Sequence, residues 1–179
     1  MPKLRQEIVQ GRPFSSLAEE ALLNLLRTSD CLQRVMHRTT RGRGITSTQY
    51  NVLRILRGAQ PNGLTCSAIG ERMITADPDI TRLLSRLKAM GLVRQQRDKR
   101  DRRVVWTHIS PAGLAMLAEM DPVIEELPTQ MLGHLGSDEL ETLIRLLELA
   151  RARCGNAQTP VSCDGTHGAS GCAVDDVQS

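Results

Sequence analysis

The chain has 179 residues, of which 40% are hydrophobic and 24% charged, a balance typical of a folded globular protein rather than a disordered chain. No apolar run approaches the roughly 20 residues that cross a bilayer, and no signal-peptide pattern opens the chain. We therefore expect a cytoplasmic protein with no membrane partner, and the five cysteines are then unsuited to a disulfide scaffold.

Positive charge is concentrated in the first two thirds of the chain. Residues 1–60 carry a net charge of +6 and residues 61–110 carry +5, whereas residues 111–179 carry −8. Between Arg82 and Arg103, nine basic residues stand against two acidic ones. Such a patch suits phosphate contact, because each neutralised phosphate releases a counterion. A solvated basic surface is the competing interpretation of the charge alone.

Aromatic residues are scarce, and this narrows the class of nucleic acid. The chain has only Phe14, Tyr50 and Trp106. Single-stranded nucleic acid is usually bound by stacking its bases on aromatic rings. Duplex DNA is therefore the better candidate for a nucleic-acid partner.

The N-terminal part predicts an arm followed by a long helix. Residues 1–16 contain two prolines and a glycine, so we expect a flexible arm. Apolar residues then recur at spacings of three, four and seven, which predicts a helix from about Ser16 to Arg38. The glycines of residues 39–44 should end it.

Two short helices are predicted next. Thr46 and Gln49 form a capping box, and the residues after them are apolar over a wide arc, which indicates a buried helix. Thr65 can cap another helix that extends to Met73, and Leu64 just before it can supply a one-residue strand.

The strongest helix start in the sequence is Asp77-Pro78. Aspartate is a good N-cap, and proline at the first helical position lacks only an N–H that would have no partner there. The predicted helix Asp77–Met90 places Ile80, Leu83, Leu84, Leu87 and Met90 on one apolar stripe, and Gly91 fits the left-handed position after its end.

A hairpin follows, with strands at Leu92–Arg97 and Val104–Ile109 around the polar tip Asp98–Arg103. Ser110-Pro111 then starts a helix that Pro122 and Pro128 should kink or divide.

The last predicted helix is capped by Ser137 and runs to about Arg153. Its leucines cover more than one face, so we expect two partners for it, one of them another subunit. Periodicity is lost after Cys154, and residues 154–179 are expected to form a disordered tail.

The order of helix, short helix, amphipathic helix and hairpin is that of a winged helix-turn-helix. We therefore predict a mainly α fold with a small β-hairpin wing. An α-helix fits the major groove, and the polar face of the predicted recognition helix would contact DNA there. That face comprises Asp79, Thr81, Arg82, Ser85, Arg86 and Lys88. Any surface helix has a polar face, so this helix alone is weak evidence.

The wing tip is more specific. Its residues Asp98, Lys99, Arg100, Asp101, Arg102 and Arg103 combine four cations with two carboxylates. Arginine is attracted into a narrow minor groove, whereas the carboxylates repel phosphate and are better suited to holding the turn. A solvated β-turn is the competing interpretation.

These motifs resemble the MarR family of transcription regulators over residues 17–153. The wing matches Asp-x-Arg-Asp-x-Arg, followed by alternating apolar residues and a Ser-x-x-Gly at Ser110–Gly113. Further similar stretches are Ile45–Leu53, Ile80–Leu87 and Gly91–Val93.

The resemblance implies a homodimer that binds a palindromic operator and acts as a ligand-responsive repressor. It implies a DNA-binding lobe at about residues 46–110, dimerisation helices at about 17–38 and 111–153, and a wing arginine, Arg102 or Arg103, in the minor groove. Family members often bind small phenolic or aromatic acids. A cleft for such an effector would lie near His37, Arg38, Tyr50, Met116 and Met120.

The alternative is a thiol-based redox or metal-responsive DNA-binding sensor. It would use Cys31 or the C-terminal cysteines, and Cys154, Cys163, His167 and Cys172 could in principle bind zinc. Their spacing is looser than in paired-cysteine sites, so we predict no metal and no cofactor. No motif of an enzyme occurs, and the chain is not expected to be one.

Overall fold

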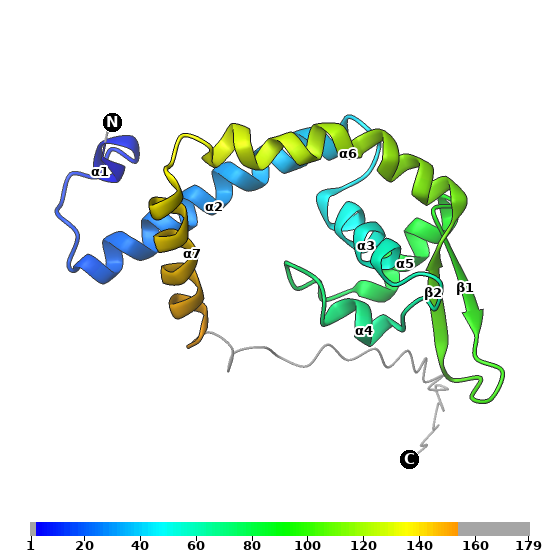
Figure 1. Ribbon diagram of the computed structural model, residues 1–179. Helices are drawn as coiled ribbons and strands as arrows, with labels where there is room; N and C mark the ends of the chain where they lie inside the picture. The colour runs from blue at the N-terminus through cyan, green and yellow to red at the C-terminus, as the bar shows by residue number, and fades with distance from the viewer. Residues whose placement is uncertain (1–2, 154–179) are drawn as a thin grey trace, which may run out of the picture.

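The computed structural model describes residues 3–153, which form seven helices and one two-stranded hairpin (Figure 1). In chain order the elements are α1 (Leu4–Glu7), α2 (Leu17–Arg41), α3 (Ser47–Gly58), α4 (Cys66–Gly70), α5 (Ile80–Ala89), β1 (Val93–Arg97), β2 (Val105–Ile109), α6 (Pro111–Leu132) and α7 (Ser137–Arg151). The mainly α fold with a β-hairpin wing is confirmed.

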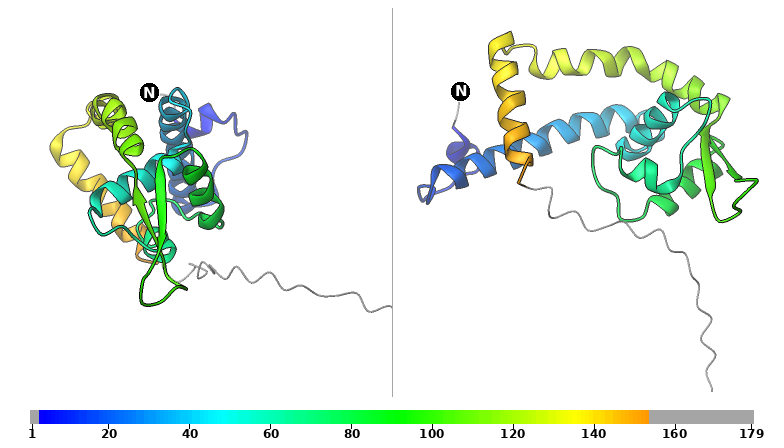
Figure 2. Two further views of the ribbon diagram at one scale, coloured as in Figure 1. Left: turned by 90° about the vertical axis from the view of Figure 1, so that its right-hand side faces the viewer. Right: turned by 60° about the horizontal axis from the view of Figure 1, so that its bottom comes forward.

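Two long helices form the framework of the molecule. Helices α2 and α6 run antiparallel to each other, with the lobe of α3, α4, α5 and the hairpin at one end (Figure 1). At the other end the chain turns back into α7, as Figure 2 shows from a second direction. The hairpin projects beyond the rest of the lobe.

The core lies where the lobe meets α6. Its buried side chains come from α3, α5, the hairpin and α6, and the most deeply buried include Leu53, Leu56, Ile69, Leu87 and Leu117. The apolar seam predicted along α6 is buried there at Leu117, Met120, Ile124 and Leu127. The lobe therefore has one continuous apolar core that extends along α6 as far as Leu127.

Capping side chains begin three of these helices as predicted. Thr46 accepts the N–H of Gln49 at 3.1 Å, and the Gln49 side chain accepts the Thr46 N–H at 2.9 Å. Thr65 accepts the N–H of Ala68 at 3.3 Å, and Ser110 accepts that of Gly113 at 3.0 Å. Each cap satisfies a backbone donor that the helix itself leaves without a partner.

The hairpin pairs its strands in antiparallel register, with Gln96 opposite Trp106 and Arg94 opposite His108. Leu64 forms the predicted one-residue bridge to Thr107. Thr107 and Ile109 are buried, so the face they share packs on the core, and the face with Gln96, Trp106 and His108 points outward.

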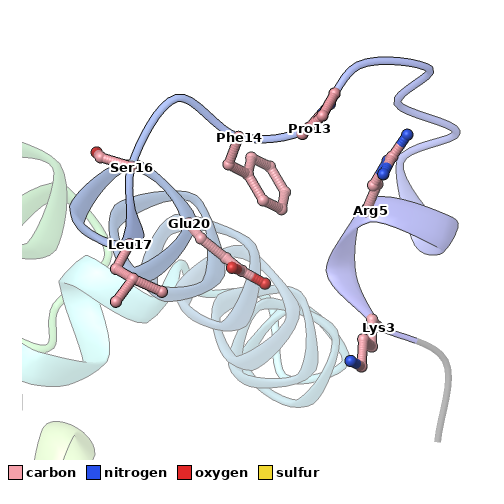
Figure 3. Close-up of a pocket in the computed structure, with 7 residues that line it drawn as sticks. All are labelled: Lys3, Arg5, Pro13, Phe14, Ser16, Leu17 and Glu20. Atoms are coloured by element: carbon pink, nitrogen blue, oxygen red, sulfur yellow. The ribbon is translucent and has the colours of Figure 1, made fainter.

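The N-terminal segment is more ordered than expected. It contains α1, whose Leu4 is buried, and Glu7 lies 3.8 Å from Arg27 of α2. The glycine and proline content predicted a flexible arm, but burial of the Leu4 side chain holds this segment in place. Figure 3 shows the pocket of about 420 Å³ between α1 and the start of α2. It is lined by Lys3, Arg5, Pro13, Phe14, Ser16, Leu17 and Glu20.

Several predicted helix boundaries were wrong. Helix α2 continues to Arg41, and in its last turns the hydroxyls of Thr39 and Thr40 donate to carbonyls of the preceding turn. Helix α4 already ends at Gly70. Pro122 and Pro128 do not divide α6, which runs through both and bows in Figure 1. Each proline removes one helical hydrogen bond, and the buried seam offsets that loss.

The start of α7 also differs from the prediction. Gly136 is the N-cap, and its N–H donates to the Glu139 carboxylate at 2.8 Å, so Ser137 is the first helical residue. No residue of α7 is fully buried. No helix within residues 3–153 is long and apolar enough to cross a membrane.

Candidate nucleic-acid interface

Helix α5 begins two residues later than Asp77-Pro78 predicted. Asp79 is the N-cap and accepts the Arg82 N–H at 3.0 Å, while the Asp77 carboxylate accepts the Asp79 N–H at 2.8 Å. Asp77 and Pro78 therefore form a turn before the helix. Both aspartates suit a cap, and in the structure Asp79 takes that place, directly before the buried Ile80.

The apolar stripe of α5 is buried at Ile80, Leu83, Leu84 and Leu87. Met90 was wrongly included, because it is the C-cap residue and is exposed. Its sulfur lies 3.8 Å from the side-chain nitrogen of Gln49. Gly91 then adopts φ 73°, the left-handed conformation predicted for it.

The opposite face of α5 carries the six predicted contact residues, all of them exposed. Asp79 is occupied as the cap, and the Ser85 hydroxyl donates to the Thr81 carbonyl at 2.9 Å. Within residues 3–153, Arg82, Arg86 and Lys88 form no ion pair. The face therefore presents three uncompensated cations next to two hydroxyls.

The wing tip is held by its two carboxylates. One oxygen of Asp98 accepts the backbone N–H of Arg100 at 2.7 Å and of Asp101 at 3.0 Å. The other accepts the indole N–H of Trp106 at 3.0 Å. Asp101 accepts the backbone N–H of Arg103 at 3.0 Å. These bonds fix the turn before any partner arrives.

The same contacts lower the pKa of both carboxyls. For Asp98, the bond from the Asp101 backbone lowers the pKa most, followed by the Trp106 indole and the Arg100 backbone. For Asp101, the Arg103 side chain lowers the pKa most. Both groups are consequently ionised near neutral pH, as their acceptor roles require.

The two candidate minor-groove arginines differ in their surroundings. The Arg103 guanidinium donates to Asp101 from Nε at 3.1 Å and from Nη2 at 3.1 Å. Over the described part of the chain, the Arg102 side chain makes no hydrogen bond or ion pair. Both side chains are exposed. The Arg103 side chain is thus oriented by Asp101, whereas the N–H donors of the Arg102 side chain all remain available for a partner.

A hollow of about 420 Å³ beside the wing brings in residues that sequence reasoning missed. Asn62, Gln96, Arg97, Trp106 and His108 line it together with Asp98, Lys99 and Arg100 of the tip. Arg97 is the last residue of β1, and Trp106 lies opposite Gln96 in β2. The pairing register of the two strands is what brings these side chains to the same hollow. The even spacing of Trp106 and His108 on one strand was the available signal for a shared face.

Comparison with known proteins identifies this arrangement. A MarR transcription factor of Planctomyces limnophilus, of known crystal structure, is 40% identical to the chain; the match covers 76% of this chain and 99% of that one, with a TM-score of 0.60. The chain belongs to the MarR family. The family model, described as "MarR family", matches residues 43–104, which include α3, α4, α5 and most of the wing.

Two further proteins are similar to the chain. The putative transcriptional regulatory protein for the hcr operon of Thauera aromatica is 28% identical over 157 residues, 87% of this chain and 90% of that protein. Bordetella bronchiseptica BpsR, whose structure concerns regulation of DNA binding by 6-hydroxynicotinic acid, shares the fold at 24% identity and a TM-score of 0.67, with 78% and 97% of the chains covered. This MarR-family chain is a DNA-binding transcription regulator and not an enzyme.

The residues suggested for an effector cleft surround the junction of α2, α3 and α6 in this MarR-family fold. His37 and Arg38 are exposed, and His37 Nδ1 lies 3.3 Å from the Ser47 hydroxyl. Tyr50 and Met120 are buried in the core, and Met116 is half-buried beside it. Burial raises the pKa of Tyr50, whose ring has Arg54 at 6.0 Å from its centroid.

Two ion pairs are formed with α6 at the same junction. Arg43 lies 2.9 Å from Glu119, and Arg57 lies 2.6 Å from Asp121. The Arg57 pair is the more shielded of the two. The Arg57 pair links α3 to α6, and the Arg43 pair links the loop between α2 and α3 to the same helix.

Cys31, the one described cysteine of the alternative function, lies apart from this interface. Cys31 is exposed on α2, and the two arginines that could activate it, Arg27 and Arg34, pair with Glu7 and Asp30. Cys154, Cys163, His167 and Cys172 lie outside the described residues. Among residues 3–153, no group of three or more His, Cys, Asp or Glu side chains could hold a metal ion.

Proposed function

We propose that this MarR-family chain is a ligand-responsive repressor that acts as a homodimer on a palindromic operator. The observation that carries the proposal is the exposed, uncompensated cationic face of α5 directly before a preformed cationic wing. In this arrangement α5 enters the major groove and the wing enters the adjacent minor groove.

On α5, Arg82 and Arg86 are one helical turn apart and would contact guanine edges or phosphates. Thr81 and Ser85 would contact bases or the backbone, and Lys88 a phosphate. Asp79 contributes as the cap that fixes where the helix starts. In the wing, Lys99, Arg100 and Arg102 would approach DNA, while Asp98 and Asp101 hold the turn.

The homodimer is supported by apolar side chains that a single chain leaves exposed. Leu17 and Leu22 are 85% and 56% exposed on α2, and Ile144 and Leu149 are 55% and 60% exposed on α7. Exposed apolar rows on two helices are unfavourable in water and mark a protein interface. We assign α2 and residues 111–153, which carry these exposed faces, to dimerisation. Residues 46–110 form the proposed DNA-binding lobe.

A small phenolic or aromatic acid is the effector class we propose. BpsR provides the parallel, because its DNA binding is regulated by 6-hydroxynicotinic acid. In this chain, Arg38 and His37 offer donors for a carboxylate near the half-buried Met116. The Arg57–Asp121 ion pair joins α6 to α3 of the lobe, so a ligand there could change the orientation of α5.

Selection of duplexes from a random pool tests the proposed DNA binding. The full chain should enrich an inverted repeat whose half-site centres are separated by about one helical turn, or a multiple of it, because a two-fold dimer presents two α5 helices. The double variant Arg82→Ala, Arg86→Ala serves as the control and should enrich no motif. Enrichment of a single asymmetric site by the wild type would contradict the dimeric binding mode.

A reporter placed under the selected site tests repression and ligand response separately. Transcription should fall when the chain is expressed and recover on addition of phenolic acids. Recovery in the Arg38→Ala, His37→Ala variant at the same ligand concentration would contradict the proposed effector region.

A further inference from the structure

Trp106 occupies an unusual place on the wing. It lies on the outward face of β2, and its indole N–H reaches across to Asp98 at the other end of the turn, at 3.0 Å. It is the only tryptophan of the chain. Half-buried on an outward face, it has little apolar core to fill, so its polar contact needs a separate explanation.

Asp98 divides its contacts between two oxygens. Oδ1 accepts the backbone N–H groups of Arg100 and Asp101, while Oδ2 accepts only the indole N–H among the described residues. The Asp98 backbone N–H donates to the Val104 carbonyl at 2.9 Å, which closes the turn at its base. The indole therefore adds the one side-chain bond that links strand β2 to the carboxylate organising the tip.

We propose that Trp106 is a positioning residue for DNA binding: by holding Asp98, it keeps the wing turn in the conformation that presents Arg100 and Arg102. The inference rests on the proposed function, since it requires the wing to contact DNA. A turn held in its bound conformation loses less conformational freedom when the complex forms, and affinity rises accordingly.

The position of the indole also makes it a reporter of DNA binding. Trp106 lines the hollow beside the wing together with Arg97, Lys99 and Arg100, three cations that would attract a backbone phosphate. A duplex seated against the wing would change the surroundings of the indole. Its fluorescence, which no other tryptophan obscures, then reports on the wing alone.

Two substitutions remove the same bond from opposite ends. Trp106→Phe keeps an aromatic ring without the N–H donor. Asp98→Asn keeps an oxygen for the two backbone donors, which turns its NH₂ group toward the indole N–H, where no hydrogen bond can form. Asp98→Asn also removes a negative charge beside the DNA, which on its own would strengthen binding. A loss of affinity in this variant therefore has to come from the lost contact.

We expect each single variant to raise the Kd for the operator duplex about fivefold, the effect of one hydrogen bond. The double variant should show no further loss, because both changes remove one interaction. The salt dependence of binding and the thermal midpoint should match the wild type, because the cations and the core are unchanged. Gln95→Ala, on the opposite face of β1 across from Thr107 and outside the hollow, is the control and should bind normally.

The spectroscopic arm distinguishes positioning from a loss of fold. Asp98→Asn should shift the emission of Trp106 in the free protein, and the operator should change that emission in the wild type. Wild-type affinity in both single variants, or losses that add in the double variant, would overturn the inference and leave the proposed function standing. Failure of the wild type to bind any duplex would instead overturn the proposed function and the inference with it.

Discussion

Arg82 and Arg102 lie in different surroundings and should contribute differently to binding. Arg82 projects from the N-terminal half of α5, where a major-groove helix meets base edges, whereas Arg102 lies at the wing tip. We expect Arg82→Ala to weaken the binding free energy for the operator by about 1–3 kcal/mol. The difference in affinity between the operator and a scrambled duplex should become smaller as well.

Arg102→Ala should instead lower the affinity for both duplexes by the same factor, and it should reduce the salt slope of binding by about one. Arg103→Ala should act in the same way and also release Asp101 from its pair. Fluorescence anisotropy on the two duplexes at several salt concentrations measures these effects. Equal loss of specificity in all three variants would contradict the division between helix and wing.

The carboxylate of Asp98 predicts how the wing responds to acid. Its pKa is lowered from the ordinary 3.8 by the hydrogen bonds that it accepts. A lowered pKa means that these bonds stabilise the turn above pH 3.8, and that this stabilisation is lost as the pH falls through the lowered value. Trp106 emission should therefore stay constant from neutral pH to about pH 4. A transition at or above that pH would contradict the contacts of Asp98.

At the scale of elements, the caps decide where α5 begins. Because Asp79 caps the helix and Asp77 only shapes the turn before it, Asp79→Ala should lower the free energy of unfolding by about 1 kcal/mol. Asp77→Ala should cost less. Chemical denaturation of the two variants makes the comparison, and a larger loss for Asp77→Ala would restore the helix start predicted from Asp77-Pro78.

Local signals in the sequence predicted most elements of the lobe. The Thr46 capping box, the Thr65 and Ser110 caps and the positive φ of Gly91 depend only on neighbouring residues, and the structure confirms all four. The start of α5 was ambiguous, because Asp77 and Asp79 are both suitable caps before the buried Ile80. The sequence could not decide this, because the choice is made by packing against distant residues.

The same distinction applies to the candidate interface. The exposed face of α5 and the composition of the wing tip follow from helical spacing and from a six-residue motif. The link from Asp98 to Trp106 and the hollow with Asn62 and Arg97 require the strand register and the loop before Leu64. Asp98 and Trp106 lie on opposite sides of the turn, and Asn62 comes from a loop before the hairpin, so composition and spacing did not predict these contacts.

At the scale of the whole molecule, the exposed apolar faces of α2 and α7 predict the behaviour of the dimer. Leu17→Glu combined with Ile144→Glu should convert the chain to a monomer, because charged side chains cannot be buried unpaired in an apolar interface. Ile74→Glu is a matched control, since Ile74 is as exposed as Leu17 but lies in the lobe. Sedimentation of the three proteins decides, and a dimeric double variant would contradict the assignment.

The most direct test is a titration of the full chain with its selected duplex at increasing salt. If each of the two chains neutralises about three phosphates with its α5 and its wing, log K should fall linearly with log salt, with a slope on the order of −5. The predicted result is a steep line at a stoichiometry of two chains per duplex. A flat line, or no binding at low salt, would contradict the account.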